Sequence, residues 1–226
     1  MGRRKQNDSN FIKEVVDNSV SEKIITKDYE GLKNLISQCK NLNHKNSKGH
    51  LPLEVALLNA DFKAATMLIE GGVDINTTNK LGLTFLHIVI RQVEEYVKLG
   101  RSQDDILSIA KKIILKGVDL SLQERRGNTS INSISQLAKA NRPNTEIYTK
   151  LAKLFLILDK NVSDTIQIKN NMGKSPMDYL ARNGNFVLRE AIYAKLPAVQ
   201  NKITEELKQK DLEIQKLMAL DKELVK

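Results

Sequence analysis

The residues whose types suit chemistry are three histidines, one cysteine and, in the part of the chain before residue 197, two pairs of adjacent acids. His87 would need a nucleophile or an orienting carboxylate beside it to act as a catalytic base. Cys39 ends a predicted helix without a matched constellation of His and Asp, so we expect a small, buried apolar side chain there. His44 and His50 fall in a predicted turn and hairpin, where we expect exposure to solvent. So few His and Cys argue against a structural zinc site.

The two acidic pairs, Glu94-Glu95 and Asp104-Asp105, would need a cleft and shifted pKa values for general acid–base work. Their positions instead suit solvated helix faces, with Asp104 and Asp105 favouring a helix N-terminus. The sequence contains no G-x-x-x-x-G-K-S/T run and no strand–G-x-G-x-x-G–helix unit. We therefore expect a protein that is not an enzyme, with no catalytic residue, no metal, no cofactor and no small-molecule substrate.

The composition narrows the class of protein. Of the 226 residues, 41% are hydrophobic and 28% are charged, which is too apolar for a disordered chain. No run approaches the roughly 18 consecutive apolar residues of a spanning helix, so we expect no membrane insertion. Four Pro and 11 Gly mark few breaks, which favours a mostly helical chain. One cysteine and a polar N-terminus without a signal-peptide core favour a cytoplasmic location.

The sequence repeats with a period of 33 residues, and this repeat predicts which elements carry the histidines and acids named above. A shift by that number superposes Asp28 on Asp61 and Gly49 on Gly82, and the matches between them are spaced like helix core positions. Residues 82–87 read Gly-Leu-Thr-Phe-Leu-His, and similar openings follow at Gly127 and Gly173.

These motifs resemble those of the ankyrin family, whose units open with G-x-T-P-L-H; here Phe85 replaces Pro. Residues 71–76, Gly-Gly-Val-Asp-Ile-Asn, resemble the G-A-D-V-N that closes such a unit. The resemblance covers roughly residues 18–195. It implies an all-α fold, an ankyrin-repeat solenoid of helix–turn–helix units with short hairpin loops. It also implies that His87 bonds Thr84 and a neighbouring backbone group.

The repeat predicts where the helices begin and end. A capping Thr or Ser, or a Pro in the first turn, begins a helix. Gly72 and Gly117 end the second helix of their units in a left-handed conformation, and we expect Asn161 to do the same in the fourth unit. The first two units place helices near residues 19–26, 29–39, 52–59 and 62–70.

Two units are longer than the family's repeat. Gly82 to Gly127 spans 45 residues and Gly127 to Gly173 spans 46. We place the extra residues between the two helices of each unit, around 94–103 and mostly around 139–145. They either lengthen the helices or form a ridge. Tolerated loop growth is the simpler interpretation, and a second binding face is the alternative.

The chain therefore divides into three parts. Residues 1–17 form a basic N-terminal segment and cap, and residues 18–196 form about five repeats. Residues 197–226 form a long amphipathic helix, which caps the last repeat, pairs with a second copy as a homodimer, or stays exposed.

The resemblance implies a protein-binding scaffold that uses its hairpin tips and the inner helix faces of a concave surface. The tips carry basic residues with apolar ones among them, which suits an acidic, partly apolar protein partner. Solvated turn residues without a partner are the alternative. The expected partner-binding residues are Lys48, His50, Lys80, Leu81, Leu83, Arg125, Arg126, Asn128, Met172 and Lys174.

Three alternatives accompany the adaptor hypothesis. The net charge of +9 motivates a nucleic-acid-binding scaffold, but aromatic residues are only 4% and Trp is absent. Self-association through residues 197–226 is the second. The third concerns origin, because degenerate repeats and an acid-rich C-terminal helix resemble effectors of intracellular bacteria of the Legionella or Coxiella kind. Such an effector would be secreted into the cytoplasm of a host cell.

Overall fold

The computed structural model describes residues 20–39, 41–139 and 142–197, together with residues 201, 205, 208 and 209. These residues form helices, turns and loops without a strand, which confirms the all-α prediction. None of the described helices is long and apolar enough to cross a membrane. Residues 20–25 are helical, and the helices that follow are α2 (Tyr29–Gln38), α3 (Pro52–Leu58), α4 (Phe62–Glu70), α5 (Phe85–Lys98), α6 (Gln103–Leu115), α7 (Ser130–Leu137), α8 (Thr145–Leu158), α9 (Val162–Thr165), α10 (Pro176–Asn183) and α11 (Phe186–Tyr193).

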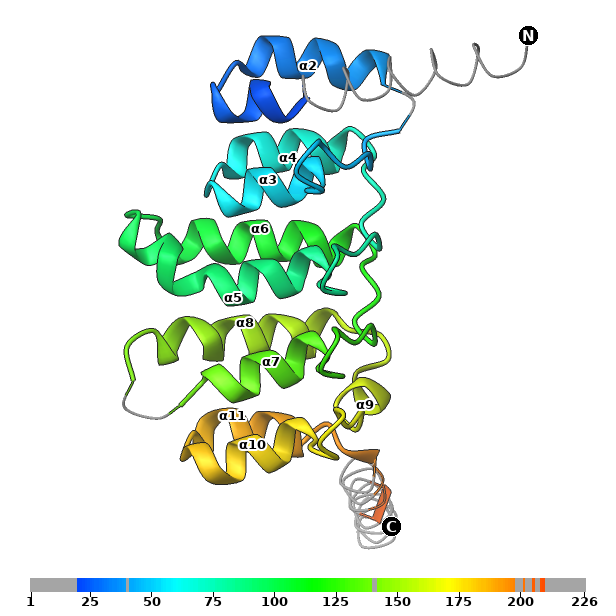
Figure 1. Cartoon of the computed structure of the whole chain (residues 1–226). Coiled ribbons are helices and arrows are strands. Elements are labelled where there is room, and N and C mark those ends of the chain that lie inside the picture. The colour runs from blue at the N-terminus through cyan, green and yellow to red at the C-terminus, as the bar shows by residue number, and fades with distance from the viewer. Residues whose placement is uncertain are drawn as a thin grey trace, which may run out of the picture.

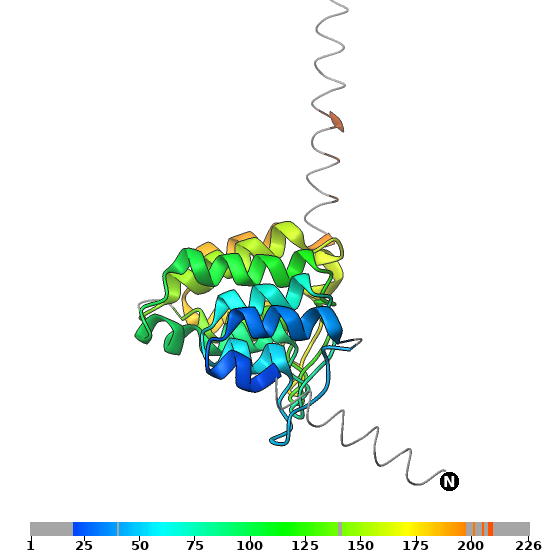
Figure 2. The ribbon, with the colours of Figure 1, turned by 90° about the horizontal axis from the view of Figure 1, so that it is seen from above.

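The helices pair and the pairs stack in one direction (Figure 1). Within the pairs, α3 packs on α4, α5 on α6, α7 on α8, and α10 on α11. Between the pairs, α3, α5, α7 and α10 contact one another in succession, and we call them the first row. The second row consists of α2, α4, α6, α8 and α11, which also contact one another in succession. The loops that join one pair to the next run along one edge of the stack (Figures 1 and 2).

Local sequence explains the helix ends. The side chains of Thr84, Thr129 and Ser175 each accept a hydrogen bond from a backbone N–H in the first turn of α5, α7 and α10, as predicted. Gly72 and Gly117 end their units with φ of 93° and 92°, which confirms the left-handed conformation expected there.

The left-handed conformation that we expected at Asn161 is not found. The φ of Asn161 is −110°, because α8 already ends at Leu158, Asp159 is extended, and Asn161 stands at the start of the short helix α9. A side chain that tolerates a left-handed conformation does not impose one. Here the chain uses the position to begin a further helical turn.

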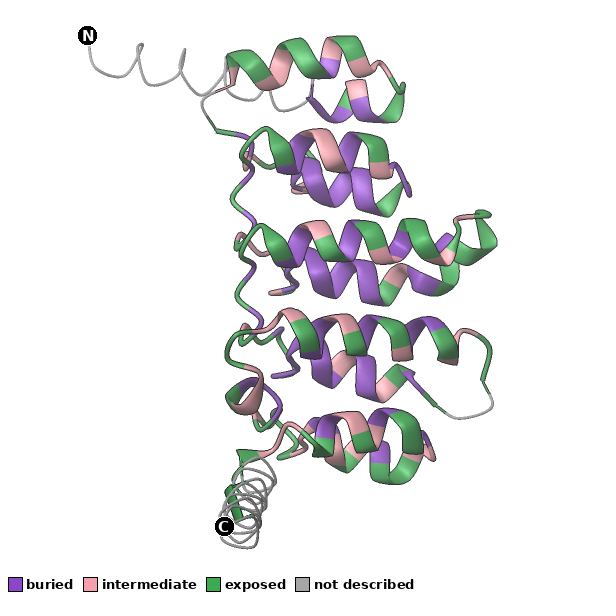
Figure 3. Cartoon of the chain, turned by 180° about the vertical axis from the view of Figure 1, so that it is seen from behind, coloured by how far each residue is buried: buried purple, intermediate pink, exposed green. Residues whose placement is uncertain are grey.

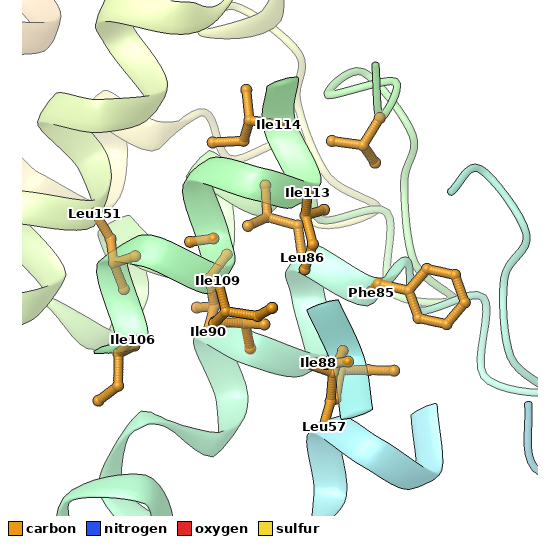
Figure 4. Close-up of a cluster of buried hydrophobic side chains, with 14 of the residues drawn as sticks. Leu57, Phe85, Leu86, Ile88, Ile90, Ile106, Ile109, Ile113, Ile114 and Leu151 are labelled. Atoms are coloured by element: carbon orange, nitrogen blue, oxygen red, sulfur yellow. The ribbon is translucent and has the colours of Figure 1, made fainter. Parts of the chain in front are cut away.

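The core lies between the two rows and between successive pairs, where Figure 3 shows the buried faces of the helices. Figure 4 shows one part of it, in which isoleucines of α5 and α6 meet Leu57 of α3 and Leu151 of α8. Burying one such side chain contributes about 1.5–3 kcal/mol. Each pair therefore depends on its neighbours for stability, since a single pair leaves these faces open.

The long third unit lengthens its helices. α5 has 14 residues and α6 has 13, against 7 and 9 in α3 and α4. Of the two predicted alternatives for residues 94–103, lengthened helices are therefore the one found, and a tight turn through Gly100, with φ of 73°, joins them.

The fourth unit distributes its extra residues differently. α7 keeps 8 residues, whereas α8 has 14 and α9 adds a turn on the loop side of the stack. The predicted position around 139–145 accounts for part of the extra length only. The basic segment 1–17 and nearly all of the predicted helix 197–226 lie outside the described residues.

Candidate functional site

His87 is a structural residue that links two units. It is fully buried; its Nδ1 lies 2.8 Å from Thr84 Oγ1, and its Nε2 lies 3.0 Å from the carbonyl oxygen of Asn128. A carbonyl can only accept, so Nε2 carries the proton and Nδ1 accepts from the Thr84 hydroxyl. Burial lowers the pKa of His87, which favours this neutral form. The contacts predicted for His87 are confirmed.

The other residues considered for chemistry also have structural surroundings. Cys39 is half-buried and packs against the core, rather than fully buried as expected. His44 and His50 are half-buried rather than exposed. Asp105 occupies the predicted helix N-terminus and forms a reciprocal cap with Ser102 at the start of α6. Within the described ranges, no group of three or more His, Cys, Asp or Glu could hold a metal ion.

Four turns on the loop edge have one hydrogen-bond pattern, and we call them the finger turns: residues 46–50, 79–83, 124–128 and 170–174. In each, the N–H of the first residue donates to the carbonyl of the fifth, and the N–H of the fourth donates to the carbonyl of the first. The fourth residue is always a glycine with positive φ. The first residue is Asn or Glu, and its side-chain oxygen accepts from the N–H of the fifth. The shared pattern N/E-x-x-G is visible in the sequence, but the repeat alignment alone did not single it out.

Backbone hydrogen bonds hold the last three finger turns side by side. The N–H of Arg125 donates to the carbonyl of Leu81 at 3.3 Å, and the N–H of Asn171 donates to the carbonyl of Arg126 at 3.1 Å. The Arg125 guanidinium also donates to the carbonyl of Lys80 at 3.3 Å. These turns therefore bring together residues that lie about 45 positions apart in the chain.

The exposure of the predicted binding residues follows their place in the turn. The second and third positions are exposed, and the fifth position is half-buried in His50 and Lys174 and buried in Leu83 and Asn128. The exposed residues are Lys48, Lys80, Leu81, Arg125, Arg126 and Met172.

Leu83 and Asn128 are therefore corrections to the predicted site. Leu83 is 6% exposed and belongs to the core, while Asn128 is 7% exposed and donates to Glu124 Oε1 at 2.7 Å. The fifth position of a finger turn returns the chain to the start of a first-row helix. Its side chain consequently packs between units rather than facing a partner.

Two clefts on the first row contain basic residues that the sequence analysis missed. One, of about 260 Å³, lies between α5, α7 and the third finger turn and is lined by Arg91, which was not predicted, beside the predicted Arg126. The other, of about 860 Å³, lies at the far end of the same helices. Gln136 and Leu137 line both, so together they cross the first row from the finger turns to the helix ends. The repeat phase locates turns, but it does not tell which helix residues face outward once a helix is lengthened.

Comparison with known protein families finds no matching family, and comparison with curated proteins finds no match either. The function proposed below therefore depends on the motifs of the sequence and on the geometry of the finger turns and the first row.

Proposed function

We propose that this protein is a non-enzymatic scaffold of the ankyrin-repeat kind that binds an acidic protein partner through its finger turns and first-row face. The stacked helix pairs and the four equivalent finger turns support the ankyrin-repeat assignment, because both recur in phase with the opening motifs. The two contacts of His87 support it as well, since they are the ones that the resemblance implies. Such stacks bind by presenting one residue set per unit along an extended surface.

The observation that carries the proposal is the basic cluster on the finger turns. Lys80, Arg125 and Arg126 are all exposed, on two adjacent turns joined by backbone hydrogen bonds. Because the backbone is held in this way, the three positive charges stay close together before any partner arrives. A fixed positive cluster steers an acidic surface toward it and sets its orientation.

Apolar side chains beside the cluster supply contact area. Met172 is 70% exposed and Leu81 is 41% exposed, each in the third position of its finger turn. An exposed, flexible Met adapts to an irregular partner surface. The combination fits a protein surface in which acidic residues surround an apolar one.

A capture experiment tests this function. The wild-type chain is immobilised, exposed to a eukaryotic cell lysate, and compared with the Arg125→Glu/Arg126→Glu variant and with a control, Lys33→Glu/Lys153→Glu, whose two lysines are exposed on second-row helices. Both variants change the net charge by the same amount. We expect acidic proteins to be captured by the wild type and the control and lost from the finger-turn variant.

Equal capture by all three proteins would contradict the proposal, provided that their helical content is the same. Recovery of nucleic acid in place of protein, sensitive to nuclease, would favour the nucleic-acid alternative. Self-association through residues 197–226 and an effector origin both stay predictions, because nearly all of that segment lies outside the described residues.

A further inference from the structure

The first row contains a notch that arises from unequal helix lengths. α5, α7 and α10 each begin three residues after the opening glycine of their unit, so their first turns are in register. α5 then continues for 14 residues, whereas α7 and α10 have 8 each. At about 1.5 Å per residue, the end of α5 projects about 9 Å beyond its neighbours. The 860 Å³ cleft lies at this step, lined by residues of all three helices and by Lys139, Arg142, Pro143 and Asn144, which lie between α7 and α8.

The described side chains that line the notch are mainly basic and apolar. Lys98, Lys139 and Arg142 line it, against a single acidic side chain, Glu94. Lys98 has a partner in Glu95 at 3.4 Å, but both side chains are largely exposed, so this pair is weak and screened. The apolar part consists of Val97, Leu137, Pro143 and Tyr179.

The C-terminal end of a helix normally presents carbonyl oxygens, which would oppose binding of an anion. In the notch, asparagine side chains already donate hydrogen bonds to carbonyl oxygens at the end of α7. The Asn183 amide donates to the carbonyls of Ser135 at 2.7 Å and Gln136 at 3.3 Å, and the Asn185 amide donates to that of Ala138 at 3.2 Å. The basic side chains therefore determine which charge the notch attracts.

We infer that the notch is a second docking site, which takes an acidic segment of a protein partner with one apolar side chain at its centre. Leu137, 37% exposed, and Val97, 39% exposed, contact the apolar side chain, while Lys139 and Arg142 bind the carboxylates beside it. A volume of about 860 Å³ is within the range of clefts that hold a small ligand, which leaves room for a few side chains of a partner.

This inference rests on the proposed function only in that the partner is a protein. The notch lies at the opposite end of the first-row helices from the finger turns, so the two surfaces can be tested separately. An acidic partner long enough to cross the first row would contact both, and the second contact would raise its affinity.

A peptide-binding experiment tests the notch directly. The probe is a fluorescein-labelled five-residue peptide of Glu and Asp with one central Leu, too short to reach the finger turns from the notch, and its control replaces the acids with Gln and Asn. Fluorescence anisotropy gives the affinity of the full chain, of Lys139→Glu/Arg142→Glu, and of the Lys33→Glu/Lys153→Glu control. We expect the acidic peptide to bind the wild type and the control alike, and the notch variant to bind at least about tenfold more weakly.

A milder variant, Lys139→Gln/Arg142→Gln, keeps the test valid if the charge reversal disturbs folding; we expect it to weaken binding about threefold. Equal binding of the acidic and neutral peptides, or unchanged binding by both notch variants, would overturn the inference. So would a single-stranded DNA of the same charge that binds as tightly as the peptide and depends on the same residues.

The finger-turn variant separates this inference from the proposed function. Arg125→Glu/Arg126→Glu should keep its affinity for the peptide within about twofold while it loses captured proteins. If the captured proteins are lost and the notch variants bind the peptide normally, the proposed function stands and the second site fails. If the notch variants bind the peptide more weakly and the finger-turn variant still captures the proteins, the second site stands and the proposed function fails.

Discussion

The imidazole Nε2 of His87 lies 3.0 Å from the carbonyl oxygen of Asn128, 41 residues later in the chain. This hydrogen bond joins the first turn of α5 to the end of the third finger turn. Since the other ring nitrogen contacts Thr84, one buried side chain connects a helix start, its cap and the following unit. The opening motif thus acts between units as well as within one.

Replacing His87 by Ala should lower the free energy of unfolding by about 3 kcal/mol. The change removes two buried hydrogen bonds and the buried imidazole ring, and it leaves the carbonyl of Asn128 with the Glu124 N–H as its remaining donor. Urea unfolding followed by circular dichroism measures the effect. The control is His44→Ala, a half-buried residue, which should cost less than about 0.5 kcal/mol. Equal effects of the two substitutions would contradict the structural role of His87.

The lowered pKa of His87 should also make the stability of the protein depend on pH. Burial lowers the pKa of His87 in the folded state below its ordinary value of 6.5. Between the two pKa values the unfolded chain binds more protons at this residue, so stability decreases as the pH falls below about 6.5. We expect the urea midpoint of the wild type to fall between pH 7 and pH 5.5. In His87→Gln the decrease should be shallower; an equally steep decrease would show that other groups cause it.

Two glycines separate the cost of a left-handed residue from the cost of close packing between finger turns. Gly127 has φ of 77°, and a Cβ added there would lie 2.6 Å from the backbone nitrogen of Asn171. Gly173 has φ of 68°, and an added Cβ would meet no atom within 4 Å. We expect Gly173→Ala to cost about 1 kcal/mol and Gly127→Ala about 3 kcal/mol. Similar unfolding free energies for the two variants would mean that the turns do not pack as described.

Tyr96 and Tyr179 differ in whether the hydroxyl group has a hydrogen-bond partner. The hydroxyl of Tyr96 is buried and has no hydrogen-bond partner among the described residues, whereas that of Tyr179 accepts from the Asn170 amide at 2.6 Å. Tyr96→Phe should therefore leave the protein as stable or stabilise it by about 1 kcal/mol, because it removes an unpaired buried group. Tyr179→Phe should destabilise by about 1 kcal/mol. Chemical denaturation of both variants decides, and a clear loss of stability in Tyr96→Phe would reveal an overlooked partner.

The positions of α3 and α4 could be predicted from the sequence almost to the residue. Pro52 in the first turn and the left-handed Gly72 are local signals that the sequence analysis used, and each acts within a few residues of the helix end it determines. The cap at Asp61 is an equally local signal that it did not use. The same reasoning failed at Asn161, where the signal is weak and the loop between units contains an additional helical turn.

The binding surface was less predictable because exposure depends on packing between units. Lys80, Arg125 and Arg126 were found by phase alone, since the middle of a finger turn faces outward whatever packs beneath it. Leu83 and Asn128 are buried because they occupy the position where the turn enters the stack. Asn128 is bonded there both within its own unit and by the Asn170 amide of the next, a contact that the phase of the repeat does not predict. Predicting the notch would have required the actual lengths of α5 and α7. The sequence does not decide whether the extra residues lengthen the helices or form a ridge.

The affinity of a captured acidic partner for the purified chain tests the central claim most directly. Isothermal titration calorimetry at low and at physiological salt would compare the wild type with Arg125→Glu/Arg126→Glu. Recognition by the finger turns predicts that the variant binds at least about tenfold more weakly and that the affinity of the wild type falls as salt rises. An equal affinity of the two proteins at both salt concentrations would contradict it.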